Sequence, residues 1–378
     1  MDHKRKRSTS NQAEARITDH PSKEWSNARN ILCVRLDTLG DVLMTTPAIR
    51  AIKESLPGCQ ITLLTSPPGA EPARHVPEID HVLIYESPWM KASPTQPDSQ
   101  YDLAMLRTLQ ARHFDAAVIF TVYSQSPLPS ALLLYLADIP LRLAHCRENP
   151  YKLLTNWVKE TEPEKTPRHE VRRQLDLVAT VGCITQDERL RFSVPNEARE
   201  CVQQYLCDAG VDMRRPWIVL HPGVTATSRQ YRPEGYAQAA RQLVGEDGLQ
   251  IIFSGSAREV ELVEQIRGWM GVPSFSMAGR LNLAELGALM EGAALLIANN
   301  TGPVHLAAAV GTPVIDLYAL TNPQHTPWCV PNRVLYHDVP CKFCYKSICP
   351  EGHHNCLELV SPQEVVQAAR DLLVETAM

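Results

Sequence analysis

The sequence lacks a long, uninterrupted apolar segment. Its most promising uncharged run, from Ala116 to Ala137, is broken by the polar stretch 124–130 and cannot supply the ~20 apolar residues that a membrane-spanning helix needs. No apolar stretch follows the basic run Lys4–Arg7 before Ile31, so no secretory signal is expected. These absences favour a cytoplasmic protein, in which the 11 cysteines, an odd number, are reduced thiols.

The chain also lacks an excess of basic residues. It has 37 Lys and Arg against 42 Asp and Glu, a net charge of −5, so no global basic field is available to hold nucleic acid. Aromatic residues make up only 6% of the 378 residues, but the 44% hydrophobic content is ordinary for a globular protein, and the length suits two domains. Residues 1–29 are polar and are predicted to be a disordered tail, whose basic run is either solvated or in contact with an anionic membrane surface.

Short apolar runs alternate with helix-length segments from Ile31 onward, which predicts βαβ units and parallel sheets. The stretch after the first run has helical spacing but contains Pro47, so either this helix is kinked or its regular part begins there with Thr46 as cap. The expected strands are Ile31–Leu36, Ile61–Leu64, Val82–Tyr85, Ala116–Thr121, Trp217–Leu220, Gln250–Ser254, Ser274–Met277, Ala294–Ala298 and Val314–Tyr318. In the second series, helices are expected near Pro233–Val244, Arg258–Trp269, Leu283–Glu291 and Pro303–Val310.

The two series predict two doubly wound domains, over residues 30–200 and 201–378, joined around residues 195–215. Ligands of such sheets bind beyond the carboxyl ends of the strands, so we expect the site in a cleft between the domains.

The loop after the first strand contains Gly40 and Asp41. Gly40 permits a sharp turn, and Asp41 then stands at the opening of a helix. Its carboxylate can be an ordinary helix cap, which is the commoner role, or a general base that faces the cleft. The G-x-G-x-x-G fingerprint is missing here, which argues against a nicotinamide or flavin site.

Three loops of the second series carry groups that suit a nucleotide diphosphate. Backbone amides, hydroxyl groups and a forked cation recognise phosphate, and a carboxylate can bind a ribose diol. Each loop also has a plain structural reading, as a polar turn, a capped helix end or a first-turn Glu favoured by the helix dipole. The candidate donor-binding residues are Gly223, Thr225, Ser228, Arg229, Glu259, Asn300, Thr301, Gly302 and His305.

A fifth loop, over residues 341–356, is rich in thiols. Cys341, Cys344, Cys349 and Cys356, with His353 nearby, match structural zinc sites in ligand type and number. The spacing after Cys344 differs from that of a standard zinc ribbon or finger, and a metal-free thiol loop is the favoured alternative.

These motifs together resemble glycosyltransferase family 9, the lipopolysaccharide heptosyltransferases, and most of all their second type. The resemblance runs from about Ile31 to Leu373. The stretches that carry it are Leu39-Gly40-Asp41-Val42, Thr46-Pro47-Ala48, His221-Pro222-Gly223, Arg229-Gln230-Tyr231, Asn300-Thr301-Gly302-Pro303, His305-Leu306-Ala307 and Gly311-Thr312-Pro313. Two positions depart from the family pattern: Asn300 stands where Asp is usual, and Arg229 where Lys is usual.

The resemblance implies a GT-B architecture, with the acceptor in the first domain and the sugar nucleotide in the second. It implies an inverting, metal-independent transfer of heptose from ADP-heptose to a lipid A-linked core oligosaccharide, without a required cofactor, at the cytoplasmic face of the inner membrane. Asp41 matches the proposed catalytic base of the family, Arg229, Thr301, Gly302 and His305 match positions around the diphosphate, and Glu259 matches an acidic position that contacts the nucleotide. Gly40 and His169 are expected on the acceptor side.

Two other functions fit the same architecture. One is a sugar-nucleotide epimerase or hydrolase, which would act without an acceptor. The other is a catalytically silent nucleotide-sugar-binding protein, which Asn300 makes conceivable.

Overall fold

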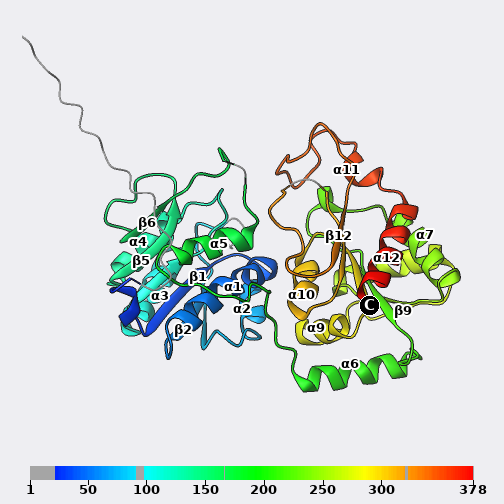
Figure 1. Cartoon of the computed structure of the whole chain (residues 1–378), viewed down its shortest axis with the longest axis horizontal. Coiled ribbons are helices and arrows are strands. Elements are labelled where there is room, and N and C mark those ends of the chain that lie inside the picture. The colour runs from blue at the N-terminus through cyan, green and yellow to red at the C-terminus, as the bar shows by residue number, and fades with distance from the viewer. Residues whose placement is uncertain (1–21, 91–97, 166, 320–321, 378) are drawn as a thin grey trace, which may run out of the picture.

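Two parallel sheets of six strands each form the framework of the computed structural model (Figure 1). The structure describes residues 22–90, 98–165, 167–319 and 322–377. The strand orders are β3-β2-β1-β4-β5-β6 and β12-β11-β10-β7-β8-β9, which is the same Rossmann-like order twice. The predicted α/β fold with two doubly wound domains is therefore confirmed.

The first domain places its central strand β1 between β2 and β4, and all neighbouring strands are parallel. Its elements are β1 (Asn30–Arg35), α1 (Leu39–Ser55), β2 (Gln60–Thr65), α2 (Pro67–Ala73), β3 (His81–Ile84), α3 (Gln100–Ala111), β4 (Ala116–Ile119), α4 (Leu128–Leu136), β5 (Leu141–Cys146), β6 (Asn156–Lys159) and α5 (Glu170–Ala179).

The second domain repeats this arrangement around β7 and ends in α12, which packs beside α7 (Figure 1). Its elements are α6 (Asn196–Asp208), β7 (Trp217–His221), α7 (Pro233–Gly245), β8 (Gln250–Phe253), α8 (Val260–Met270), β9 (Phe275–Ser276), α9 (Leu283–Glu291), β10 (Leu295–Asn299), α10 (Gly302–Val310), β11 (Val314–Leu317), β12 (Asn332–Leu335), α11 (Asn355–Glu358) and α12 (Pro362–Thr376), with single 3₁₀ turns at Thr227–Arg229 and Ala257–Glu259. The first domain has one such turn at Trp25–Asn27, before β1. The predicted boundary between residues 200 and 201 falls inside α6, and this helix packs on α9 of the second domain.

Helix α1 runs through Pro47 instead of starting there. Proline has no N–H to donate to the carbonyl of Leu43 four residues earlier, but the hydroxyl of Thr46 donates to that oxygen at 2.7 Å. The same hydroxyl accepts a hydrogen bond from the backbone N–H of Arg191 at 3.0 Å. Thr46 is thus an internal residue that compensates for the proline, and its predicted role as cap is wrong.

The predicted tail extends too far along the chain. Trp25 is fully buried in the core of the first domain, and its indole N–H donates to Oδ1 of Asn156 at 3.2 Å. Residues 22–29 are therefore part of this domain, held by the apolar area of one large aromatic ring. Residues 1–21, with the basic run, lie outside the described residues.

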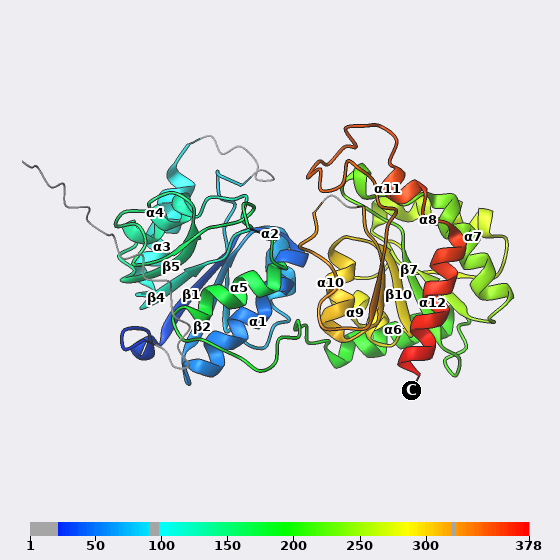
Figure 2. The same ribbon diagram turned by 45° about the horizontal axis from the view of Figure 1, so that its top comes forward.

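The two domains meet along the helices that face each other between the sheets (Figure 2). Helix α1 contacts α10, and their apolar residues belong to one continuous core cluster. The segment 322–330 of the second domain also reaches the first: the carbonyl of Gln324 accepts from the N–H of Glu170 at 3.0 Å, and the indole of Trp328 donates to the carbonyl of Glu188 at 2.8 Å. Within the described residues, none of the helices combines the length and apolarity needed to cross a membrane.

Candidate active site between the domains

A cavity of about 560 Å³ lies between the N-terminus of α1 and the loops that follow β7 and β10. Its volume is within the usual range for a small-molecule site. The first domain contributes Thr38, Leu39, Gly40, Asp41, Met44 and Pro68, and the second contributes His221, Gly223, Val224, Thr225, Arg229, Glu259, Asn300, Thr301, Gly302, Pro303, His305 and His325. The cavity thus brings together Asp41 and all but one of the predicted donor-binding residues.

Asp41 occupies the third position of α1, where it caps the helix and also lines the cavity. Its Oδ2 accepts hydrogen bonds from the backbone N–H of Thr38 at 3.3 Å and from the hydroxyl of Thr38 at 3.1 Å, which caps the helix. Its Oδ1 accepts from Arg35 at 3.1 Å, and its side chain remains 20% exposed in the cavity wall. Burial acts to raise the pKa of Asp41, but Arg35 and other neighbours outweigh it and hold the pKa below its ordinary value of 3.8.

Arg35 is a residue of the site that sequence reasoning missed. It is fully buried at the end of β1, and it contacts Asp37 at 3.0 Å, Asp41 at 3.1 Å and Glu170 at 2.8 Å. Burial raises the pKa of Asp37 to about 6, although Arg35 opposes the shift. One guanidinium group therefore serves three carboxylates and fixes the orientation of Asp41. The signal in the sequence was an arginine at the end of an otherwise apolar strand.

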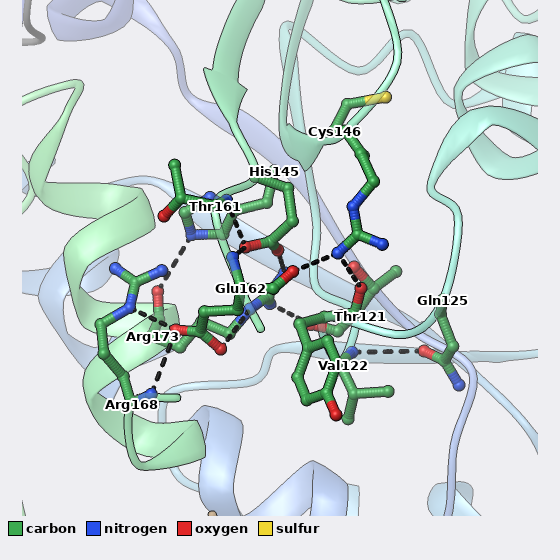
Figure 3. A network of polar contacts seen from close by, with 12 residues as sticks. Thr121, Val122, Gln125, His145, Cys146, Thr161, Glu162, Arg168 and Arg173 are labelled. Carbon is green, nitrogen blue, oxygen red and sulfur yellow. Dashed lines mark hydrogen bonds and ion pairs between the residues drawn. The ribbon is translucent and has the colours of Figure 1, made fainter. Parts of the chain in front are cut away.

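A second polar network in the first domain centres on Arg173 and Glu162 (Figure 3). Buried Arg173 donates to the carbonyl of Thr121 and pairs with Glu160, and Arg168 donates to Oε1 of Glu162 at 2.6 Å. The loop after β4 also contacts the carboxylates around Arg35, since the side-chain amide of Gln125 donates to Oδ1 of Asp37 at 2.6 Å. The network links α5 and the β4–α4 loop to the carboxylates around Arg35.

The N-terminus of α10 forms the opposite wall of the cavity. Thr301 precedes the helix without capping it, because its hydroxyl donates backward to the carbonyl of Asn299 at 3.2 Å. Pro303 has no N–H, and the N–H of Val304 donates to the carbonyl of Thr301 at 3.1 Å, which leaves the N–H of Gly302 in this turn. An N–H at a helix start is suited to bind an anion, and the helix dipole adds to the attraction. The backbone at Thr301 and Gly302 thus has the geometry of a phosphate site.

His305 extends from the first turn of α10 toward α1. Burial lowers the pKa of His305 to about 3, with His325 as the next contribution, so the ring is neutral near pH 7. Its Nδ1 is buried and has no hydrogen-bond partner among the described residues. The neutral ring of His305 can therefore donate or accept one hydrogen bond in the cavity.

Arg229 and Glu259 contribute the charges of the second domain. Arg229 lies in the cavity wall at the end of a 3₁₀ turn. The carboxylate of Glu259 lies against Gly223, where a Cβ would approach its Oε1 to 1.9 Å, so a larger residue there would displace this carboxylate. Oε2 of Glu259 also accepts from the N–H of Ser256 at 2.6 Å. Glu259 is thus a cap that also faces the cavity.

Asn300 holds the loop in place through its amide group. Its Nδ2 donates to Oδ2 of Asp316 at 2.8 Å and to the carbonyl of His325 at 2.8 Å. Asp316 is fully buried at β11, and burial raises the pKa of its carboxyl to about 8, against the opposing effects of Asn300 and Arg229. Asn300 thus stands where the family pattern has a carboxyl group, and it contacts the buried carboxyl group of Asp316, which sequence reasoning did not single out.

Two predicted residues do not line the cavity. The hydroxyl of Ser228 donates to the carbonyl of Lys346 at 2.8 Å, away from the cavity, because the side chain is buried beneath the thiol-rich loop. The ring of His169 stacks on Trp328 with centroids 4.3 Å apart, and its Nε2 lies 2.9 Å from the carbonyl oxygen of Thr326. Burial lowers the pKa of His169 to about 4. Ser228 and His169 are therefore structural contacts in this arrangement, one to a loop and one between the domains.

His325, from the same segment as Thr326, lines the cavity without having been predicted.

Gly40 sets how closely the two domains approach at the site. A Cβ at Gly40 would lie 2.6 Å from Cδ2 of the buried His305 ring, so either the ring or helix α1 would have to shift. We expect Gly40→Ala to push α1 from α10 and to lower the free energy of unfolding by about 1–3 kcal/mol, the usual cost of overpacking. Urea denaturation measures the loss. Gly268→Ala is the matched control, since a Cβ there meets nothing within 4 Å in α8. Equal behaviour of the two variants would contradict this reading of Gly40.

Comparison with known proteins agrees with this geometry. The model of the family described as "Glycosyltransferase family 9 (heptosyltransferase)" matches residues 103–354, which is more than half of the chain. The chain belongs to glycosyltransferase family 9. It is therefore a glycosyltransferase, and the family predicted from the sequence motifs is confirmed.

Individual relatives have low sequence identity, but the alignments cover most of both chains. The chain is 27% identical over 283 residues to lipopolysaccharide heptosyltransferase 2 of Escherichia coli, which covers 71% of this chain and 78% of the relative. It is 22% identical over 305 residues to the lipopolysaccharide core heptosyltransferase OpsX of Haemophilus influenzae, covering 80% and 82%.

Solved structures show the same fold. A family 9 glycosyltransferase from Veillonella parvula superimposes with a TM-score of 0.76 at 22% identity, covering 92% of this chain and 97% of that one. The ADP-heptose lipopolysaccharide heptosyltransferase II of E. coli gives 0.70 at 21% identity, covering 92% and 100%. These similarities confirm the GT-B architecture.

Proposed function

We propose that this glycosyltransferase moves a heptose from ADP-heptose to a lipid A-linked lipopolysaccharide core acceptor, with inversion at the anomeric carbon. The observation that carries the proposal is the single cavity in which Asp41 of the first domain faces the loops of Arg229 and Thr301 in the second. The names of the family and of the curated relatives supply the sugar and the acceptor class.

In the proposed reaction, an acceptor hydroxyl oxygen attacks the anomeric carbon from the face opposite the diphosphate. The new C–O bond forms as the bond to the diphosphate oxygen breaks, and Asp41 takes the hydroxyl proton. A carboxylate with a lowered pKa is ionised near pH 7 and ready to accept it. Asp41 thus performs the acid–base work from the first domain.

The leaving ADP carries the developing negative charge. Arg229 and the N-terminus of α10, through its helix dipole and the N–H of Gly302, are placed to stabilise it, and the neutral ring of His305 can add a hydrogen bond. We propose that Glu259 binds the nucleoside part, since its carboxylate faces the same cavity. The proposed chemistry uses no metal at the diphosphate and no cofactor, and it takes place at the cytoplasmic face of the inner membrane, where the enzyme is peripherally bound.

A donor screen followed by an acceptor assay tests the proposal. ADP-heptose at a hundredfold excess over its dissociation constant should stabilise the protein by about 2.7 kcal/mol in a thermal-shift experiment. With core-deficient lipopolysaccharide added, mass spectrometry should show one heptose transferred for each ADP released.

Three outcomes would contradict the assignment. Stabilisation by GDP- or UDP-sugars but not by ADP-sugars would overturn the donor. ADP release at full rate without acceptor would indicate a hydrolase or epimerase. Tight donor binding without turnover across a panel of core acceptors would indicate a silent binding protein.

A further inference from the structure

The thiol-rich loop between β12 and α11 encloses a small cavity. Cys341, Cys344, Cys349 and Cys356 all line it, and its volume of about 20 Å³ is enough for one ion or one water molecule. All four residues are free thiols. Four sulfur atoms around one small space are the ligand set of a structural zinc site.

His353 is oriented to support such a site from outside. Its Nδ1 accepts a hydrogen bond from the backbone N–H of Asn355 at 3.0 Å, so the neutral ring carries its proton on Nε2. That Nε2 lies 3.9 Å from Sγ of Cys341. The ring is thus placed to donate to a thiolate sulfur and is not free to act as a metal ligand through the same nitrogen, which leaves the four thiols as the ligands.

We propose that Cys341, Cys344, Cys349 and Cys356 bind one Zn²⁺ ion as four thiolates. Binding forms four Zn–S bonds and releases the four thiol protons. Within the described residues, no three such side chains already stand at ligand distances from one point. The ion therefore has to draw the sulfur atoms inward to ~2.3 Å, which closes the loop around it.

The closed loop would stabilise the nucleotide side of the active site, an inference that rests on the proposed function. Two donors of Ser228 are bound to this loop: its hydroxyl donates to the carbonyl of Lys346 at 2.8 Å, and its N–H donates to the carbonyl of Ser347 at 3.2 Å. Arg229 follows directly in the cavity wall. At the tip of the loop, Tyr345 contacts Tyr123 of the first domain edge-on, with ring centroids 6.2 Å apart. The metal would thus fix the position of Arg229 in the cavity wall, although the metal itself lies outside the active site.

Metal analysis of the full chain tests the proposal. Protein purified under reducing conditions, supplied with zinc and dialysed should retain about one Zn²⁺ per chain. The double variant Cys341→Ser/Cys344→Ser should retain less than about a tenth of an equivalent. The matched control is Cys201→Ser/Cys207→Ser, because these two thiols are exposed on α6 and lie outside the loop; it should keep its zinc.

A measurement on the unmutated protein tests the same ligands without depending on whether the variant folds. Titration of the thiols with an organomercurial should release the zinc in step with modification, as read by a chromogenic chelator. Absence of zinc from the unmutated protein, zinc retained by the Cys341/Cys344 variant, an equal loss in the control, or stoichiometric iron instead of zinc would each overturn the proposal.

The link to the active site has its own measurement. Removing the zinc should weaken the binding of ADP-heptose about fivefold or more, measured by calorimetry against the zinc-loaded protein. Unchanged affinity would overturn the link. If the zinc-loaded protein binds zinc but not ADP-heptose, the proposed donor fails and the metal site stands.

Discussion

Asp41→Asn should lower the turnover number of heptosyl transfer by about 10²–10⁴-fold, the usual contribution of a general base. Asparagine has the shape of aspartate, so it still accepts the N–H of Thr38 and keeps the helix cap. It cannot take a proton from the acceptor. The affinity for ADP-heptose should change little, because the proposed diphosphate contacts come from the other domain. Initial rates with core-deficient lipopolysaccharide, together with donor titrations, separate the two effects.

Asp102→Asn is the matched control for this variant. Asp102 is also the third residue of a helix, α3, so its loss removes the same first-turn charge from a helix N-terminus far from the cavity. The turnover number of this control should remain close to that of the unmutated protein. Full activity of Asp41→Asn, or equal losses in both variants, would remove Asp41 from its proposed role.

The position of Asp41 also predicts how the rate depends on pH. The pKa of Asp41 lies below 3.8, so the carboxylate stays ionised from neutral pH down to that range. A loss of rate between pH 5 and 7 would therefore come from another group. Asp37, whose pKa burial raises to about 6 while Arg35 opposes the shift, is the nearest candidate.

The architecture could be predicted from the sequence because the central strands are apolar on both faces. Runs such as Ile31–Leu36 and Ala294–Ala298 follow from the burial of parallel strands under helices on each side. Strands nearer the edges of the sheets do not all have this property. β5, next to the edge strand β6, contains Arg142 and His145, and the edge strand β12 begins with Asn-Arg, so their sequences resemble loops and they were not predicted.

The candidate site was predictable where backbone geometry determines it. A glycine or proline next to a strand end marks a turn at the carboxyl edge of the sheet, and this logic placed Gly40 and Gly302 correctly in one cavity. It could not place side chains within a loop. Ser228 and Arg229 are adjacent, yet one faces the thiol-rich loop and the other faces the cavity. His169 was drawn away from the site by Trp328, a partner 159 residues later in the chain.

Arg35→Met should lower the free energy of unfolding by about 3–5 kcal/mol, the usual cost of removing one partner from a buried ion pair. Methionine fills part of the volume but leaves Glu170, which is fully buried, beside Asp37 and Asp41 without a cation between them. The three carboxylates would then repel one another in a medium that screens charge poorly. Urea denaturation followed by tryptophan fluorescence reports the loss, since Trp25 lies in the core of the same domain.

Arg189→Met separates this effect from the general loss of an arginine. Arg189 pairs with Asp187 at 2.8 Å, but its side chain is 69% exposed, so water screens the pair and the denaturation midpoint should hardly move. If the two variants lose equal stability, Arg35 does not hold the carboxylates together. If only Arg35→Met unfolds at a lower urea concentration, the buried cation that orients Asp41 also stabilises the first domain. The reason is that one guanidinium group, from β1, binds carboxylates of α1 and α5.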